Sequence, residues 1–154
     1  MRVHMKNTKL DCPVDFVAIN EYQARWTALL VLVLTIGYLV SGYLAIPAFL
    51  AVDFFLRASK WGKYSLLGRF GKTLVRVFGA GNKPVDRAPK RFAALVGLLF
   101  TSAMTVLHGL GIATVSYVLG DILAVFALLE AAFAFCAGCY VYTLIKPLLP
   151  LKSL

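Results

Sequence analysis

Residues 24–41 read ARWTALLVLVLTIGYLVS, and Arg25 is the one charged residue among them. A helix needs about 20 consecutive apolar residues to cross the roughly 30 Å hydrocarbon core of a bilayer. The segment is close to that length and carries its charge at one end, so it predicts a transmembrane helix. The whole chain agrees with a membrane setting, because 60% of its 154 residues are hydrophobic and only 15% are charged. A soluble domain of this size has a less apolar composition.

Three further segments have a similar apolar character. We expect membrane spans at residues 44–58, 91–108 and 115–145. The first of these is short and holds Pro47 in its first turn, where a missing backbone N–H costs little. The last is longer than the bilayer requires and has to tilt or protrude. The sequence therefore predicts an all-α integral membrane four-helix bundle of two hairpins, in a single transmembrane domain over residues 1–154.

The positions of lysine and arginine predict the orientation of the chain. Four of the sixteen lie in residues 1–25, ten lie between Arg57 and Arg91, and two are Lys146 and Lys152. All of them fall on one side of a four-span arrangement. Because an excess of these residues marks cytoplasmic loops, we expect both termini and the central loop in the cytoplasm, with the chain in the inner membrane. Basic residues confined between apolar runs fit anionic lipid headgroups better than nucleic acid.

The central loop contains an amphipathic segment at residues 64–79. Its apolar residues fall on one helical face, and its basic residues share the other. These basic residues are Arg69, Lys72 and Arg76. Such a helix lies in the headgroup layer of a membrane, and Trp61 and Tyr64 are suited to anchor it at the interface. We expect a linker containing Pro84 and Pro89 to lead from this helix into the third span.

The two predicted hairpins begin alike. Residues 25–30 read RWTALL, and residues 91–96 read RFAALV. Each opening is followed by a span, a glycine-containing turn, and a second span with an acid, Asp53 or Asp121. Two hairpins that begin on the same side of a membrane are related by an axis along its normal. Shared composition explains the likeness equally well, so the sequence leaves both explanations open.

Two cysteines lie three positions apart in FCAGCY, residues 135–140. At that spacing Cys136 and Cys139 share a helix face with Cα atoms about 5 Å apart, which suits a disulfide. Apolar surroundings raise the pKa of a thiol, so reactivity requires local opening or a nearby cation such as Lys146. Chance packing of small side chains and metal ligation are the other hypotheses for the pair. Cys12 is predicted on the same side of the membrane and is a candidate resolving thiol.

Ionisable side chains inside predicted spans are costly, and they are therefore candidates for function. Asp53 lies four residues before Arg57, which predicts a structural ion pair. Glu130 falls near the middle of the fourth span with no cation close in sequence, so we expect it to be protonated, hydrogen-bonded across the bundle, or lining a wet cavity. Asp121 and His108 fall toward the outer side, where the sequence predicts that they form a polar cluster.

The sequence resembles a family of small bacterial membrane proteins of unknown function that share a Phe-Cys-x-Gly-Cys-x-x-Tyr signature in the last helix. The matching residues here are Phe135, Cys136, Gly138, Cys139 and Tyr142. Residues 89–93, PKRFA, look like the start of the family's third span. The resemblance covers most of the chain, from Cys12 to about Ile145. It implies thiol or sulfur handling, because members tend to be encoded near or fused to thioredoxin-like or sulfurtransferase proteins.

These observations favour a membrane thiol-disulfide or sulfur-transfer protein in which Cys136 is the nucleophile and Cys139 the resolving thiol. The alternatives are a small transporter or channel whose path is lined by intramembrane acids, and a non-catalytic membrane scaffold. No cofactor and no metal site are predicted. The predicted partners are the lipid bilayer, a soluble thioredoxin-like or sulfurtransferase protein, and a second copy of the chain in a homodimer.

Overall fold

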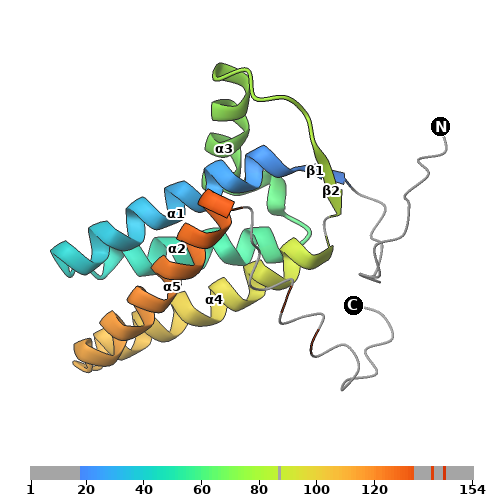
Figure 1. The fold of residues 1–154 in the computed structure, drawn as a ribbon. Helices are drawn as coiled ribbons and strands as arrows, with labels where there is room; N and C mark the ends of the chain where they lie inside the picture. Colours follow the sequence, from blue (N-terminus) through green and yellow to red (C-terminus); the bar gives the residue numbers. More distant parts are fainter. Residues whose placement is uncertain (1–17, 87, 134–139, 141–143, 145–154) are drawn as a thin grey trace.

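The computed structural model describes residues 18–86, 88–133, 140 and 144. Within these residues the chain is almost entirely helical (Figure 1). The helices are α1 (Glu21–Ser41), α2 (Ala45–Ala58), the 3-10 turn η1 (Gly62–Tyr64), α3 (Leu66–Val77), α4 (Ala88–Gly109) and α5 (Ala113–Phe133). Two three-residue strands, β1 (Ala18–Asn20) and β2 (Pro84–Asp86), complete the described part.

Three of the helices are long and apolar enough to cross a membrane: α1, the segment Lys90–Gly109 of α4, and α5. They indicate a membrane protein. Helix α2 has 14 residues, which at 1.5 Å per residue span only about 21 Å. It falls short of the roughly 30 Å of hydrocarbon, so the prediction of four spans is confirmed for three helices.

The fourth predicted span, residues 115–145, is only partly within the described chain. Helix α5 has 21 residues, close to the length that a bilayer requires. Of the remaining predicted residues, 134–139, 141–143 and 145 lie outside the described residues. The expected excess length of this span falls mainly on these residues and stays a prediction.

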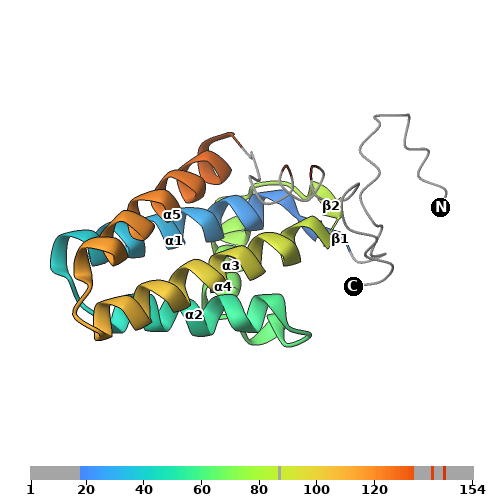
Figure 2. The same cartoon turned by 90° about the horizontal axis from the view of Figure 1, so that it is seen from below.

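The four longer helices lie side by side (Figure 2). Helix α1 packs along α5, α2 packs along α4, and α4 also contacts α5, so that α1, α2, α4 and α5 form a closed arrangement. The interior is mainly apolar. Its most deeply buried apolar residues are Val31, Tyr38, Leu50, Phe54, Met104 and Leu123.

The outer surface of these helices is also apolar. Val40 is 85% exposed, Leu99 is 70% exposed and Phe133 is 76% exposed. Exposed apolar side chains on this scale mark a surface that contacts lipid or another protein rather than water. The exterior therefore supports the membrane setting independently of helix length.

Tight turns join the helices of each hairpin. Gly42 follows α1 with a φ of 65°, and its N–H donates to the carbonyl of Tyr38. Gly111 lies between α4 and α5 with a φ of 83°. Only glycine adopts this left-handed conformation readily, so these residues stop the helices and allow the chain to reverse.

The two hairpins bury residues at equivalent positions. Shifting the sequence by 66 positions places Thr35 on Thr101 and Tyr38 on Met104, and all four side chains are fully buried. Both threonines donate to a carbonyl four residues earlier in their own helix. Composition alone does not explain equivalent burial at equivalent positions, so the structure supports true repetition.

Helix α3 lies crosswise to the four longer helices (Figure 1). Ser65 begins it by accepting a hydrogen bond from the N–H of Gly68 at 3.0 Å, as an N-cap residue does. A Cβ at Gly71 would collide with the Thr27 side chain, so glycine allows α3 to approach α1 closely. The predicted helix at 64–79 is confirmed as a helix over Leu66–Val77.

The predicted linker around Pro84 contains a short strand, whereas Pro89, which was expected in the same linker, lies in the first turn of α4. Strand β2 pairs antiparallel with β1, and Asn20 lies opposite Pro84. The side chain of Asn20 also caps α1 by accepting from the N–H of Tyr22 at 3.1 Å. The pairing therefore ties the segment after α3 back to the start of α1.

Candidate functional site

One end of the helices gathers the charged residues, and we call it the basic end. It comprises the start of α1 and α4 and the end of α2 and α5, with Arg25, Arg57, Lys90 and Arg91. The opposite end, with the turns at Gly42 and Gly111, is called the turn end. The candidate site lies at the basic end.

Arg25 of α1 holds the end of α5. Its Nε donates to the carbonyl of Ala131 at 3.0 Å, and its Nη2 donates to the carbonyl of Ala132 at 3.1 Å. Peptide carbonyls point toward the C-terminal side of a helix and attract cations there. Helix α5 has no basic residue in its own last turn, so the cation comes from α1.

Arg91 of α4 holds the end of α2 in the same way. Its Nε and Nη2 donate to the carbonyl of Ala58 at 3.3 and 3.1 Å. Each hairpin therefore begins with an arginine that holds the last turn of the other hairpin's second helix. This exchange gives a structural reason for the repeated arginine in RWTALL and RFAALV.

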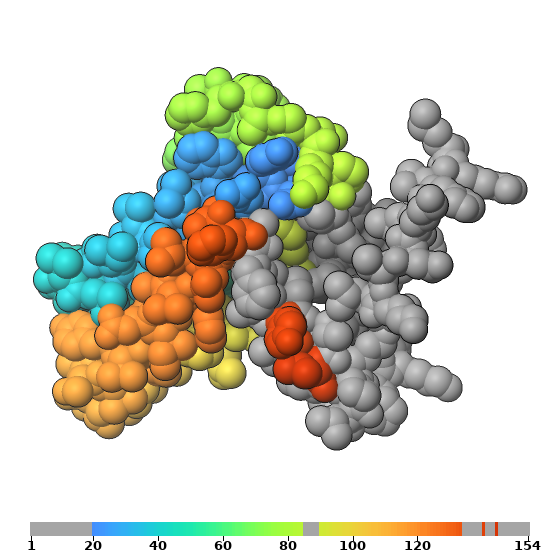
Figure 3. All heavy atoms as spheres, viewed as in Figure 1, coloured from blue at the N-terminus to red at the C-terminus, as the bar shows by residue number. Residues whose placement is uncertain are grey.

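A pocket of about 430 Å³ opens beside Arg25 between α1 and α5. Its lining residues are Tyr22, Arg25, Trp26, Leu29, Ala80, Leu128, Ala131 and Ala132. Trp26 stacks on Phe78 with ring centroids 5.1 Å apart. Arg25 is the one charged residue among the lining residues. Figure 3 shows the atoms of α1 and of the end of α5 meeting on this face.

The predicted thiols follow directly in sequence. Helix α5 ends at Phe133, and Cys136 is three residues further on. Cys12, Cys136 and Cys139 all lie outside the described residues. The structure therefore shows the cation and the pocket that precede the cysteine pair, and the role of the pair itself stays a prediction.

Asp53 is the most buried acid of the described chain, with 2% of its surface exposed. Its Oδ1 accepts from the Ser65 hydroxyl at 2.8 Å and from the N–H of Leu67 at 3.1 Å. Its Oδ2 lies 3.1 Å from Nε of Arg57. The predicted ion pair is confirmed, although its geometry is not that of a hydrogen bond. Asp53 thus joins α2 to the first turn of α3.

Glu130 faces cations that come from other helices. Glu130 lies three residues before the end of α5, and its Oε1 is 3.9 Å from Nζ of Lys90 on α4. Arg57 is also close enough to interact with it electrostatically. Two cations therefore face this acid. The sequence did not indicate them, because Lys90 and Arg57 lie 40 and 73 positions before Glu130.

The predicted cluster of His108 and Asp121 is not formed. Nδ1 of His108 lies 2.8 Å from the Tyr38 hydroxyl, which in turn lies 2.6 Å from the hydroxyl of Ser116. Ser116 donates to the carbonyl of Met104 at 2.9 Å. This buried chain joins α1, α4 and α5 near the turn end. Asp121 is exposed, with no hydrogen bond or ion pair to the rest of the described chain.

Sequence reasoning missed Arg25, Tyr38 and Ser65 as organising residues. The repeated arginine was a signal for the first, because both copies stand at the start of a hairpin. Tyr38 and Ser65 gave no such signal, because their partners lie on other helices. What these residues do depends on which helix faces them.

The apolar exterior, the three long helices and the charged basic end define an all-helical membrane protein. The chain belongs to the family described as Domain of unknown function (DUF4395), whose profile matches residues 19–146. The match covers both hairpins and includes Cys136 and Cys139. Neither a curated protein nor a solved structure matches the chain.

Proposed function

We propose that this protein is a membrane thiol-disulfide exchange or sulfur-transfer protein whose active thiols are Cys136 and Cys139. Its partner is a soluble thioredoxin-like or sulfurtransferase protein. The observation that supports this proposal best is the position of Arg25. Its guanidinium binds the carbonyls of Ala131 and Ala132 in α5, five and four residues before Cys136.

Arg25 meets the main chemical objection to a reactive thiol in a membrane. Three residues of extended chain reach at most about 11 Å, so Cys136 lies within that distance of the Phe133 Cα. A nearby cation lowers the pKa of a thiol, whereas apolar surroundings raise it. We infer that Arg25 of α1 takes the role that was expected of Lys146.

The exchange proceeds in two balanced steps. The thiolate of Cys136 attacks a disulfide of the partner, forming a mixed disulfide and releasing one partner thiolate. The thiolate of Cys139 then attacks the Cys136 sulfur and releases the second partner thiolate. Two electrons pass from the cysteine pair to the partner, and a reduced partner drives the reverse sequence. Cys12 is suited to resolve the pair as a third thiol.

Sulfur transfer uses the same nucleophile. The Cys136 thiolate attacks the outer sulfur of a persulfide on the partner, which leaves as a thiolate. Cys136 then carries the persulfide until another thiolate accepts its outer sulfur. No electron acceptor besides the two proteins is needed. The pocket beside Arg25 gives the partner's reacting segment an accessible surface at the basic end.

We place the basic end in the cytoplasm of the inner membrane, with α2 completing a four-helix transmembrane bundle. The supporting observations are the lysine and arginine excess at this end and the crosswise position of α3, which suits a helix in the headgroup layer. Because α2 is short, α3 packs against it at the depth of Thr27 rather than at the start of α1. Both termini are then cytoplasmic.

The transporter hypothesis is less well supported. Its polar groups form two separate clusters, around Tyr38 near the turn end and around Asp53 near the basic end. Val31 and Leu50, with 3% and 0% of their surfaces exposed, pack between the clusters. Uptake that depends on Glu130 and is unaffected by Cys136→Ser would favour it over thiol exchange.

The decisive experiment traps the three cysteines by alkylation in intact membranes. Peptide mass spectrometry then reads their state before and after treatment with reduced thioredoxin. We expect a Cys136–Cys139 disulfide, or a persulfide, that thioredoxin removes. Thiols that stay reduced and unmodified under oxidising and sulfur-donating conditions would refute the proposal.

Arg25→Gln tests the cation, and Arg91→Gln is its matched control in the other hairpin. Loss of Arg25 is expected to slow alkylation of Cys136 at pH 7 several-fold, because less of the thiol is ionised. Arg25→Lys is expected to restore most of the rate. Equal rates in the Arg25→Gln and Arg91→Gln proteins would show that Arg25 does not act on the thiol.

A further inference from the structure

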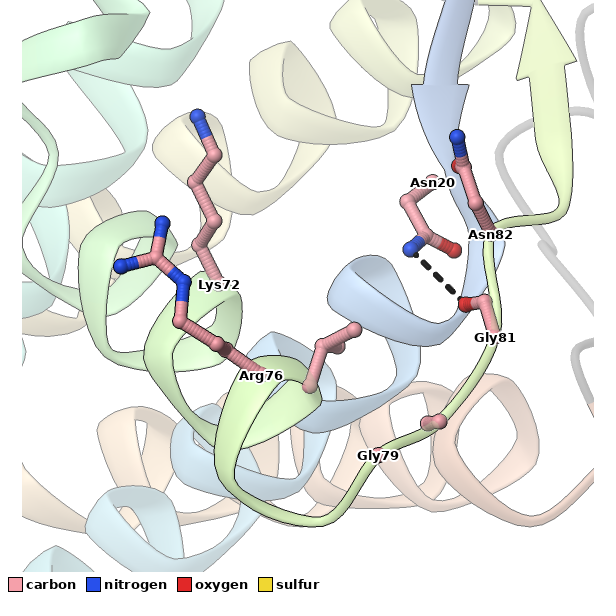
Figure 4. Close-up of a pocket in the computed structure, with 8 residues that line it drawn as sticks. Asn20, Lys72, Arg76, Gly79, Gly81 and Asn82 are labelled. Carbon is pink, nitrogen blue, oxygen red and sulfur yellow. Dashed lines mark hydrogen bonds between the residues drawn. The ribbon is translucent and has the colours of Figure 1, made fainter.

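A second pocket, of about 370 Å³, lies between α3 and the segment that leads into β2. Its lining residues are Asn20, Lys72, Val75, Arg76, Gly79, Ala80, Gly81 and Asn82. In Figure 4 the two basic side chains come from α3 on one side, and Asn20 and Asn82 stand on the other. The pocket is a shallow hollow that is wide open on one side. No acid contributes to the lining.

The basic wall carries two positive charges that the described chain leaves without a counter-ion. Lys72 and Arg76 are exposed and form no ion pair with any described residue. They are four positions apart on α3, so their charged ends are neighbours and repel each other. An anion bound between them relieves this repulsion.

The opposite wall is held in place by Asn20. The Nδ2 of Asn20 donates to the carbonyl of Gly81 at 3.1 Å, and its Oδ1 accepts from the N–H of Lys83 at 3.3 Å. These bonds fix the segment after α3 against the start of α1. The wall is therefore formed before any ligand binds.

This wall also offers donors. Asn82 is exposed, and no hydrogen bond to the described residues occupies its side-chain amide. Gly79 has a φ of 61°, and a Cβ placed on Gly79 or Gly81 would meet no atom within 4 Å. The backbone therefore leaves open space over the segment, where main-chain N–H groups in such a turn form an anion-binding concavity.

We propose that this pocket binds the phosphate group of an anionic lipid headgroup. Arginine and lysine provide charge-assisted donors for phosphate oxygens, and the glycine segment and Asn82 close the site. The other face of α3 carries the exposed apolar residues Phe70 and Val77, which suits contact with acyl chains. The inference concerns α3 and β2, and it does not depend on the thiol chemistry.

The test uses the full-length protein purified in a mild detergent. Binding of short-chain phosphatidylglycerol is measured by native mass spectrometry, with short-chain phosphatidylcholine and inorganic phosphate in parallel. We expect phosphatidylglycerol to bind most tightly. Inorganic phosphate binding as tightly would overturn the lipid source and assign the site to a soluble phosphate compound. Phosphatidylcholine binding as tightly would overturn the anionic site.

Two variants separate the pocket from the general charge of the surface. Lys72→Gln with Arg76→Gln is expected to weaken phosphatidylglycerol binding at least tenfold, since both charges act at close range. The matched control, Lys63→Gln with Arg69→Gln, removes the same charge from residues that do not line the pocket. Equal weakening in both double variants would overturn the proposal.

Asn82→Ala removes an amide from the opposite wall without changing the charge. It is expected to weaken binding several-fold if the phosphate lies inside the pocket. Unchanged binding in this variant would show that the lipid contacts only the basic face of α3, and it would overturn the pocket as the site.

Discussion

The buried carboxylate of Asp53 gives the sharpest test of the packing at the basic end. Asp53→Asn keeps the shape of the side chain and an oxygen that can accept from Ser65 and from the N–H of Leu67. It removes the negative charge 3.1 Å from Nε of Arg57. The substitution therefore isolates the charge from the hydrogen bonds.

The expected cost follows from what is left behind. Arg57 keeps its charge, and its buried Nη2 has no hydrogen-bond partner among the described residues even with Asp53 present. Removing one partner of a buried ion pair typically destabilises a protein by about 3–5 kcal/mol. At about 2–4 °C per kcal/mol for a chain of this size, the melting temperature should fall on the order of 10 °C.

The assay is thermal unfolding of the purified protein in detergent, followed by tryptophan fluorescence. Asp121→Asn is the matched control, because Asp121 is exposed and pairs with none of the described residues. It should shift the melting temperature by no more than about 2 °C. A second variant, Asp53→Asn with Arg57→Met, should recover much of the loss, since it removes the unpaired charge.

Two results would refute this reasoning. A shift in the Asp53→Asn protein no larger than that of Asp121→Asn would show that the charge of Asp53 does not matter to folding. Failure of Arg57→Met to recover stability would show that the unpaired arginine is not the cause of the loss.

Three further predictions concern other parts of the fold. Tyr38→Phe removes a buried hydroxyl that bridges two partners, and it should cost about 1–3 kcal/mol; denaturant unfolding unchanged from the natural protein would contradict this. A Cβ on Gly97 would lie 2.5 Å from the ring of Phe54, whereas one on Gly109 would meet nothing. Gly97→Ala should therefore destabilise by about 1–3 kcal/mol, while Gly109→Ala should not, and equal melting temperatures would count against the packing. Lys83 forms an ion pair with Glu21, and the hydrogen bond between them raises the pKa of Lys83. The small contribution of this ion pair to stability is therefore present at pH 7, and it is lost as the pH rises through the pKa of Lys83. The melting temperatures of the natural protein and of Lys83→Met should converge in alkaline buffer and in high salt, and a difference that persists there would exclude the ion pair as its source.

The sequence by itself determined where the helices lie along the chain. Long apolar runs predicted α1, α4 and α5, and the amphipathic period predicted α3, because both patterns depend on residues close together in the chain. Glycines at the turns located the reversals of the chain, since only local backbone conformation is involved. The ion pair of Asp53 with Arg57 was predicted for the same reason, because four residues make one helical turn.

Only the tertiary structure decided which polar groups meet. Arg25 binds carbonyls more than 100 positions away, and Lys90 faces Glu130 across two helices. Neither contact follows from hydropathy, because each depends on the rotation of a helix about its axis and on its depth beside a neighbour. Hydropathy places a helix in the membrane, whereas side-chain packing between helices fixes its rotation, and that rotation brings a cation to the end of α5 just before the cysteine pair.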